Sequence, residues 1–458
     1  MSVDLHPAPS LVTGRAGSEP PRGPFARIVL GSVVTGLGLA LALALVVFAG
    51  ATEGTITGAV LLGFGAGWAL LVALSARLTD RPQRWAVVPA GLMGATGLAL
   101  LVLNPGPAAL TTIGWVWPAP VLALAVFVWR GARRDLPRRG RRLLAPVVAV
   151  LALAPVAATY ENLTVVRDHQ AYAAPGTRYE VGGHSLYLEC HGQGSPTVVL
   201  DNGLGEVAAS WVRIVTRVSS TTRVCAYDRA GQGWSQPTAD AQDGITAARD
   251  LHALLRAAGE HGPYVLAGHS IGGTYAMTYA AAYPAQVAGM VLLDSSSPQQ
   301  FTALDSYPTQ YAVAHRVLAL SPTLNRLGLG RVVAALAPSS LPAPAAGEVR
   351  ALTASAQGAG SASAEWQVLP ELFEQAQALT TLGDRPLAVL TASESLQKTD
   401  GWGAAQERIA ALSHTSSQRV VESSHVGLLE GEHGADAAAR AIEDIVTAVR
   451  GRSERSLR

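Results

Sequence analysis

Lysine and cysteine are scarce in this sequence. Of its 34 basic residues only Lys398 is a lysine, and the 458 residues include two cysteines, Cys190 and Cys225. Arginine in place of lysine, with many alanines and glycines, is typical of a GC-rich bacterial genome. No group of cysteines and histidines has the spacing of metal ligands, so we expect no bound metal. The Gly-Gln-Gly stretch at residues 231–233 lacks the context of a dinucleotide-binding turn, so we expect no cofactor.

Charge is missing from five stretches in the first 160 residues. These uncharged runs cover residues 28–50, about 54–76, 85–104, 108–129 and 143–160. Four are about 20 residues or longer, which is enough to cross roughly 30 Å of hydrocarbon as a helix. Because four more runs follow the first, it predicts a true span and not a cleaved signal peptide. None of the runs contains Lys, Arg, Asp, Glu or His, which favours an anchor over an ion or proton path.

The loops between these runs alternate in charge. Residues 77–85 and 130–142 are rich in arginine, whereas residues 51–55 and 104–109 contain no lysine or arginine. Basic loops favour the cytoplasmic side, so the pattern predicts a multi-pass cell-membrane protein with a cytoplasmic N-terminus. Everything after about residue 161 is then expected outside the cytoplasm. This orientation accounts for the basic first half of the chain, and we expect no nucleic-acid partner.

The second part of the chain alternates between strand-like and helix-like segments. Such alternation predicts a mainly parallel sheet with helices on both faces. One long helical block interrupts it and is too long for a simple connection, so it is interpreted as an inserted cap. The expected organisation is a disordered cytoplasmic tail (1–25), a five-helix transmembrane region (26–161), a linker (162–177), a core (178–297 and 384–452), a helical cap (298–383) and a tail (453–458).

A Gly-x-Ser-x-Gly motif spans Gly268 to Gly272, between an apolar strand-like run and a helix-like run. In that context the serine sits in a sharp turn with its hydroxyl exposed, so Ser270 is the candidate nucleophile. A nucleophilic serine needs a base, and His425 follows the last predicted strand. It also needs amides that stabilise an oxyanion, for which we expect the backbone N–H groups of Leu204 and Ile271.

Five segments resemble successive signatures of the α/β-hydrolase superfamily: "PTVVLDNGLG", "VCAYDRAGQGWS", "GHSIGG", "YPAQVAGMVLLDSS" and "SSHVGLLE". The resemblance covers residues 178–450 and implies an eight-stranded sheet, a cap between strands six and seven, and a Ser-acid-His triad. It assigns Asp228 and Arg229 to a structural turn. It also makes the strands of Cys190 and Cys225 neighbours, so we expect a disulfide between them outside the cytoplasm.

The sequence departs from the superfamily pattern at two points. The oxyanion loop has Asn202 before its glycine where relatives usually have histidine, and "TASESL" lacks the aspartate that often follows strand seven. Glu394 lies one residue before that position, and a one-residue slip turns a side chain to the other face. Asp294, at the end of strand six, would be costly to bury without a partner. We therefore expect Asp294 to be the triad acid, with Glu394 as the alternative.

These features predict a membrane-anchored serine hydrolase that cleaves an acyl or lipid-like ester through an acyl-enzyme. A serine nucleophile argues against the dehalogenase and epoxide-hydrolase branches, which resemble this fold but use aspartate. Peptidase, amidase or perhydrolase chemistry on the same scaffold is the first alternative. The second is a non-catalytic protein that binds or senses a small-molecule ligand. The oligomeric state stays open.

Overall fold

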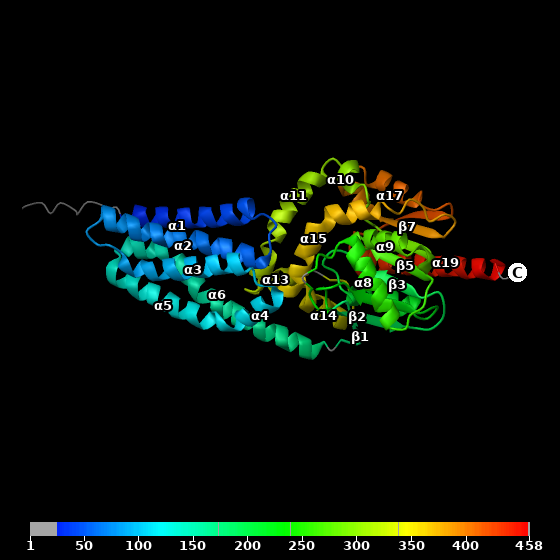
Figure 1. Ribbon diagram of the computed structural model, residues 1–458, viewed down its shortest axis with the longest axis horizontal. Helices are drawn as coiled ribbons and strands as arrows, with labels where there is room; N and C mark the ends of the chain where they lie inside the picture. The colour runs from blue at the N-terminus through cyan, green and yellow to red at the C-terminus, as the bar shows by residue number, and fades with distance from the viewer. Residues whose placement is uncertain (1–24, 173, 239, 338, 457–458) are drawn as a thin grey trace, which may run out of the picture.

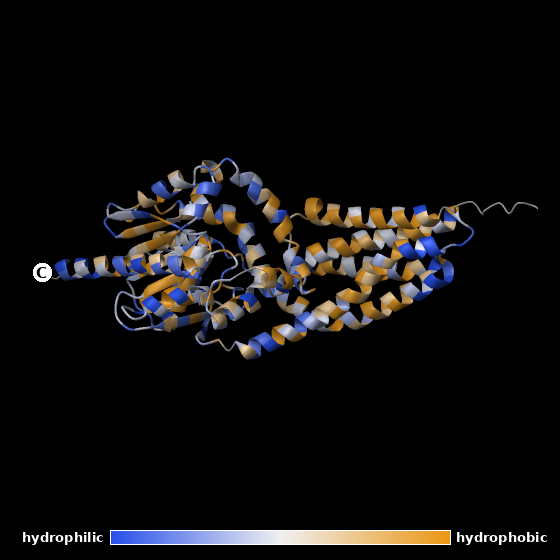
Figure 2. Cartoon of the chain, turned by 180° about the vertical axis from the view of Figure 1, so that it is seen from behind, coloured by the Kyte–Doolittle hydropathy of each residue, from blue (hydrophilic) through white to orange (hydrophobic). Residues whose placement is uncertain are grey.

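The computed structural model describes residues 25–456 except 173, 239 and 338, so nearly all of the expected tail at 1–25 lies outside it. Figure 1 shows two parts joined end to end: a bundle of long helices (residues 25–171) and a sheet domain (residues 177–456). Figure 2 shows that apolar residues dominate the bundle, whereas the sheet domain mixes apolar and polar residues.

The bundle contains long apolar helices and two short irregular ones. They are α1 (Phe25–Ala42), η1 (Leu43–Val47), α2 (Glu53–Leu78), η2 (Arg84–Ala86), α3 (Val87–Leu103), α4 (Pro107–Val116), α5 (Pro118–Asp135) and α6 (Arg138–Ala171). Four helical segments are long and apolar enough to cross a membrane: Phe25–Val47, Glu53–Leu78, Arg84–Leu103 and Arg138–Ala171. Helices α4 and α5 are bent by 50° and make a fifth span if they are taken as one. The bend occurs where Pro118 removes a backbone donor.

The last helix of the bundle is longer than the sequence analysis expected. A linker was expected at residues 162–177, but α6 continues as a helix to Ala171. Glu161 and Asp168 lie in this continuation, and both carboxylates pair with Arg331 of the sheet domain. Pro146 and Pro155 also lie inside α6.

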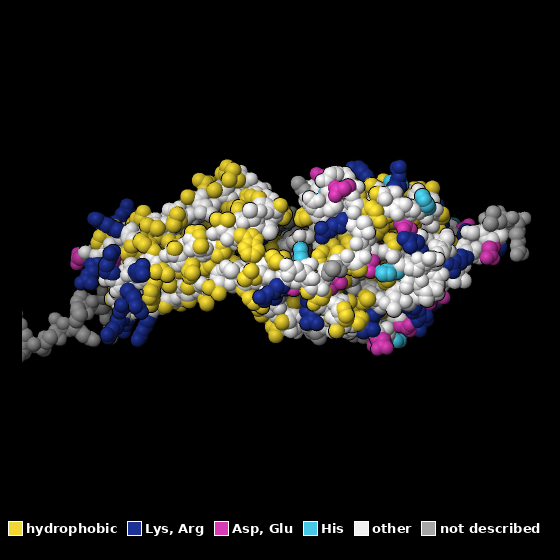
Figure 3. Space-filling view, turned by 90° about the horizontal axis from the view of Figure 1, so that it is seen from below, with side chains coloured by type: hydrophobic (Ala, Val, Ile, Leu, Met, Phe, Trp, Pro, Cys, Tyr) yellow, Lys and Arg dark blue, Asp and Glu magenta, His cyan; other side chains and the backbone are white. Residues whose placement is uncertain are grey.

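Small residues bring the bundle helices close together. A Cβ added at Gly63 of α2 would lie 2.3 Å from the backbone nitrogen of Ala40, and one added at Gly67 would lie 2.8 Å from the Cα of Gly36. Close approach of this kind is the usual way in which helices pack where lipid removes the hydrophobic driving force. Figure 3 shows apolar side chains over the bundle and basic side chains at its end away from the sheet domain.

The sheet has eight strands in the order β1-β2-β4-β3-β5-β6-β7-β8. They are β1 (Thr177–Val181), β2 (His184–His191), β3 (Val198–Asp201), β4 (Val224–Asp228), β5 (Tyr264–His269), β6 (Val287–Leu293), β7 (Leu387–Ala392) and β8 (Ser416–Val421). Strand β2 is antiparallel to both of its neighbours, and the pairs from β4 to β8 are parallel. The predicted, mostly parallel eight-stranded sheet is therefore confirmed.

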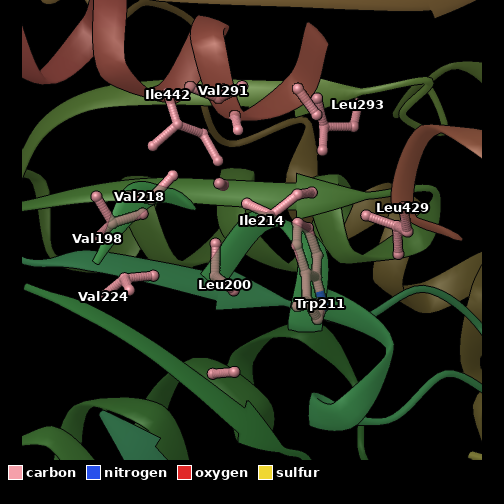
Figure 4. Packing of buried hydrophobic residues seen from close by; sticks show 14 of the residues in the cluster. Val198, Leu200, Trp211, Ile214, Val218, Val224, Val291, Leu293, Leu429 and Ile442 are labelled. Carbon is pink, nitrogen blue, oxygen red and sulfur yellow. The ribbon is translucent and has the colours of Figure 1, made fainter. Parts of the chain in front are cut away.

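Helices cover both faces of the sheet. One face packs on η3 (Ala208–Trp211), α7 (Val212–Val218), α18 (Gly427–Glu430) and α19 (Glu432–Ser456); the other packs on α8 (Gly244–Ala257), α9 (Ile271–Ala282) and α17 (Trp402–Ala410). Figure 4 shows Trp211 and Ile214 beside Leu200, with Ile442 over Val291. Strands buried on both faces are continuously apolar, as β5 and β6 are. Helix α19 includes residues 453–456, which were expected in a tail.

A set of helices that we call the cap is inserted between β6 and β7. Its members are α10 (Gln300–Ala303), α11 (Tyr307–Leu318), α12 (Ser321–Asn325), α13 (Leu329–Leu336), α14 (Ala343–Thr353) and α15 (Ala356–Ala376). The remaining short helices are η4 (Pro284–Gln286) and α16 (Ser393–Lys398). Figure 1 shows α11, α13 and α15 between the bundle and the sheet, so the cap contacts both parts of the molecule.

Candidate active site

Ser270 occupies a strained turn between β5 and α9. Its backbone has φ 55° and ψ −124°, and its N–H donates to the carbonyl of Leu293 at 3.1 Å. A positive φ is costly for a residue other than glycine and persists only where the surroundings impose it. The turn leaves the Ser270 side chain partly exposed among buried neighbours.

The flanking glycines of the motif are required by close contacts. A Cβ at Gly268 would lie 2.5 Å from the backbone of Gly272, and a Cβ at Gly272 would lie 2.2 Å from the carbonyl oxygen of Asp201. Any side chain at either position would force the turn away from the end of β3. The motif therefore holds Ser270 against the loop that follows β3, in which Leu204 lies.

His425 and Asp294 come together beside this turn. His425 Nδ1 lies 2.6 Å from Asp294 Oδ2, and Asp294 has no exposed surface. Asp294 also accepts hydrogen bonds from Trp402 Nε1 (2.8 Å), Ser395 Oγ (2.5 Å) and the amide of Ala392 (3.2 Å). Burial would raise the pKa of Asp294, but its bonds to His425, Ser395 and Trp402 lower the pKa below the ordinary value.

Glu394 contacts the backbone of His425 and not its ring. Glu394 Oε2 accepts from the His425 amide at 3.1 Å, while Oε1 accepts from Lys398 Nζ at 2.5 Å. Lys398 lowers the pKa of this exposed carboxyl, with a smaller contribution from the His425 amide. Of the two expected acids, Asp294 is the one that lies against the imidazole.

The Ser270 hydroxyl makes no hydrogen bond within the described residues, to His425 or to any other group. The rings of His425 and His269, the residue before Ser270, have centroids 4.5 Å apart, so His425 lies directly beside the turn. In structures without substrate such nucleophile–base contacts are often long and tighten only when substrate binds.

The two expected oxyanion amides have no hydrogen-bond partner among the described residues. Leu204 follows β3 and Ile271 begins α9, and both side chains belong to one apolar cluster with cap residues. The neighbouring amide, that of Gly203, is already bonded to Glu206 Oε2 at 2.5 Å. Asn202 is buried and anchors the loop, since it accepts from Trp211 Nε1 at 2.8 Å and donates to the Tyr227 carbonyl at 2.9 Å.

Sequence analysis did not assign a role to Glu206 or His269. His269 Nδ1 lies 2.6 Å from Glu206 Oε1, and His269 Nε2 donates to the carbonyl of His425 at 3.0 Å. Burial would lower the pKa of His269 and raise that of Glu206, but their mutual attraction raises the first and lowers the second. The only sequence signal was their position: His269 lies inside the Gly-x-Ser-x-Gly motif, and Glu206 directly follows the segment "PTVVLDNGLG". Their pairing between the loop after β3 and the end of β5 is not local.

Arg229 links the site to the cap. It is buried, and its guanidinium lies 2.6 Å from Asp201 Oδ1 and 2.8 Å from Glu365 Oε1 of α15. It also donates to the carbonyl of Asn202 at 2.7 Å. Asp228 accepts from the amide of Ala208 at 2.7 Å, which fixes the next turn. Both residues support the architecture around the oxyanion loop.

Aromatic residues of the cap gather over the turn. The ring centroid of Phe301 lies 5.0 Å from that of Tyr307, 5.1 Å from that of Tyr311 and 5.7 Å from that of Phe373. These rings pack in the same cluster as Leu204 and Ile271. The space next to Ser270 is therefore bordered by apolar surface from α11 and α15.

Cys190 and Cys225 lie directly opposite one another on the antiparallel strands β2 and β4. They are joined by a disulfide, and their Cα atoms are 4.0 Å apart.

Comparison with known proteins finds relatives for part of the sheet domain. Residues 196–316 match the family model for the alpha/beta hydrolase fold. The chain carries an α/β-hydrolase domain. This domain is similar to a candidate alpha/beta hydrolase of Nostoc sp. PCC 7120, with 17% identity and a TM-score of 0.50 over 59% of this chain and 97% of that chain.

Among curated proteins, lipase LipV of Mycobacterium tuberculosis is 40% identical over 114 residues, which is 24% of this chain and 41% of LipV. The uncharacterized protein YbdG of Bacillus subtilis is 28% identical over 144 residues, which is 31% of this chain and 44% of YbdG. The chain thus spans less than half the length of these two relatives. The α/β-hydrolase domain and its similarity to a protein named as a lipase support the view that this chain is a hydrolase.

Proposed function

We propose that this chain is a membrane-anchored serine hydrolase that cleaves an acyl or lipid-like ester through an acyl-enzyme. The observation that carries the proposal is the 2.6 Å contact between His425 and the fully buried Asp294, beside the strained turn of Ser270. Since one fold serves many reactions, the proposal rests on these side chains and not on the α/β-hydrolase fold.

In the proposed reaction Ser270 Oγ attacks the ester carbonyl carbon and gives its proton to His425 Nε2. The amides of Leu204 and Ile271 donate to the oxyanion. The bond between the carbonyl carbon and the alkoxy oxygen of the ester then breaks, and the alcohol leaves with the proton from His425. Water, deprotonated by His425, attacks the acyl-enzyme and releases the acid. Asp294 accepts from Nδ1–H throughout, which fixes the tautomer and stabilises the imidazolium.

The surroundings of Ser270 favour an apolar acyl group. The aromatic cluster of the cap and the side chains of Leu204 and Ile271 offer an apolar wall on the side of the oxyanion amides. A site lined mainly by apolar side chains with a few polar groups is typical of small-molecule binding. The apolar helices of the bundle suit a protein held in the cell membrane, close to lipid-like substrates.

The test is turnover of an ester panel with acyl chains from short to long, by purified full-length protein. We expect Ser270→Ala to remove turnover, and Asp294→Asn to lower kcat by about 10⁴-fold because the imidazole loses its tautomer partner. Glu394→Gln should stay close to wild type, because that carboxylate contacts His425 only through its backbone amide and not through its ring.

Thermal melts would verify that each variant is folded. If Glu394→Gln loses orders of magnitude while Asp294→Asn keeps turnover, the acid follows β7 and our assignment is wrong. If the folded wild-type protein cleaves none of the esters, the proposed ester chemistry fails, and amide and peracid substrates are the next to examine.

A further inference from the structure

The cap is fastened to the end of the bundle that faces the sheet domain. Arg326, at the end of α12, pairs with Glu53 at the start of α2, with Nη2 3.0 Å from Oε2. Thr323 Oγ1 lies 2.8 Å from Thr57 Oγ1, one turn further along α2. Ala319 is buried against Ala44 and Ile56 of the bundle. The cap is therefore held at a fixed height relative to the membrane-crossing helices.

A second contact, between α13 of the cap and α6 of the bundle, shows at which level along the membrane-crossing helices the cap is held. This helix has 34 residues, and at 1.5 Å per residue it is about 51 Å long, well beyond the roughly 30 Å of a hydrocarbon core. Counted from the arginines at its start, the hydrocarbon ends after about 20 residues, near Glu161. Arg331 of α13 pairs with Glu161 and with Asp168 two turns later. Helix α13 thus lies where the outer headgroups begin.

Helix α13 exposes an apolar stripe at this level. Leu329, Val332, Val333 and Leu336 have the spacing i, i+3, i+4, i+7, and their exposed fractions run from 44 to 82%. Arg331 lies roughly 150° away around the helix, at 3.6 residues per turn. The polar face therefore contacts the bundle and the apolar face points away from the protein. Helix α11 adds Val313 and Val317, which are also more than half exposed.

We propose that the α13 stripe lies in the outer leaflet of the bilayer, among the first methylene groups of the acyl chains. A short amphipathic helix with its apolar face outward is suited to the boundary between headgroups and acyl chains. The occupant is the bilayer because α13 is fastened through Arg331 to Glu161 and Asp168, at the level where the apolar run of α6 ends. At that same level Leu163 and Val166, on the face of α6 opposite these two carboxylates, are also exposed.

The inference specifies the substrate class and rests on the proposed function. Helix α11 runs from the aromatic cluster, through Tyr307 and Tyr311, to the packing contacts of Ala319 and Leu320 with the bundle. An ester that resides in the outer leaflet would reach Ser270 along the apolar surface of α11 without crossing water. The substrate is thus expected to be a membrane-resident lipid ester, with a short soluble ester a poorer substrate.

Introduced cysteines offer a direct test, because both native cysteines are joined in the disulfide. Leu336→Cys is labelled with an environment-sensitive fluorophore in full-length protein, reconstituted in phosphatidylcholine vesicles that carry an acyl-chain spin quencher. Leu103→Cys, at the outer end of α3, is the bundle control; Val420→Cys, exposed on β8, is the aqueous control. The label at 336 should lose roughly half or more of its fluorescence.

The controls separate this inference from the proposed anchoring. Quenching at 103 and 336 but not at 420 supports the inference. Quenching at 103 without quenching at 336 overturns it and leaves the anchoring intact. Absence of quenching at all three positions overturns the anchoring, and the inference with it.

A second measurement addresses the substrate. Val333→Ser combined with Leu336→Ser should lower kcat/KM roughly tenfold for a vesicle-embedded lipid ester, because the cap loses apolar contact with the leaflet. Turnover of a short soluble ester should not change, which shows that the site is intact. Val420→Ser is the matched control. Equal loss on both substrates, or no loss on the lipid ester, would contradict lateral delivery.

Discussion

At the scale of single residues, the candidate site concentrates backbone strain. Ser270 and Asp294 both have positive φ, at 55° and 45°, and both lie at the carboxyl ends of adjacent strands, β5 and β6. Such conformations cost about 1–3 kcal/mol each, so the fold must hold them in place. They place two short side chains at the ends of neighbouring strands. Asp294 contacts His425, and the His425 ring lies beside the turn that holds Ser270.

The pair Glu206–His269 lies next to this site, since His269 also donates to the carbonyl of His425. The contribution of this pair to the stability of the fold should depend on pH. The raised pKa of His269 means that its stabilisation is complete below the ordinary value of 6.5 and is lost as pH rises through the folded pKa. The lowered pKa of Glu206 means that its contribution is present above 4.5 and is lost as pH falls through the folded value. The interaction is therefore strongest between these limits.

Glu206→Gln should lower the unfolding free energy by about 1–3 kcal/mol near pH 6, and by less near pH 9, because the stabilisation that accompanies the raised pKa of His269 is lost as pH rises. Thermal melts of the two proteins at both pH values measure this difference. Glu260→Gln is the matched control: Glu260 pairs with Arg223 at 2.6 Å, and arginine stays charged throughout. An equal penalty for Glu206→Gln at both pH values would show that His269 does not titrate in this range.

Most residues of the candidate site could be named from the sequence alone. Ser270 and His425 could be predicted because the motif and the position after the last strand are local signals. Asp294 required an argument from strand ends, and its geometry now favours it over Glu394. Glu206 and His269 could not be paired in advance, because the contact depends on how the β3 loop packs against the β5 turn.

At the scale of elements, the positions at which helices end were harder to predict from the sequence than the existence of the helices. Charge at Glu161 marked the end of an apolar run, yet α6 continues to Ala171, because glutamate is a good helix former and ends an apolar run without ending a helix. The bend between α4 and α5 falls at Pro118, inside a run that was expected as one span. Strand positions were easier, because the central parallel strands β3 to β7 are short, largely apolar and bounded by turn residues. The edge strand β8 is the exception, since most of its residues are polar and exposed.

A buried ion pair between Glu365 of the cap and Arg229 of the core holds the cap on the sheet domain. Glu365→Gln removes the charge that faces Arg229 and should destabilise the sheet domain by about 3 kcal/mol, because both groups are buried. Chemical denaturation measures the loss, and protease cleavage within α15 should become faster. Arg419→Ala, which breaks the exposed pair with Asp444, should cost less than about 1 kcal/mol. If the two variants cost the same, the Arg229 contact does not hold the cap.

At the scale of the whole molecule, the arginine loops and the sheet domain lie at opposite ends of the bundle (Figure 3). The loop pattern predicted this separation, but the position of the cap between the two parts was not in the sequence pattern. It follows from ion pairs between residues more than 150 positions apart, such as Arg331 with Glu161.

The orientation itself is testable with reporter fusions. Alkaline phosphatase fused after Ala171 should be active, because the arginine loops are expected in the cytoplasm and α6 leads outward. The same reporter fused after Asp135, in the arginine-rich loop before α6, should be inactive. A fluorescent cytoplasmic reporter should give the reverse pattern, and activity of the phosphatase only at Asp135 would show that the sheet domain faces the cytoplasm.

The central claim is that Ser270 is an activated nucleophile, and covalent labelling tests it most directly. Membranes that contain the full-length protein are treated with a fluorophosphonate, and the adduct is located by peptide mass spectrometry. We predict one adduct, on Ser270, that is absent from Ser270→Ala and strongly reduced in Asp294→Asn. Failure of the folded wild-type protein to react, or equal labelling of Ser270→Ala, would contradict the account.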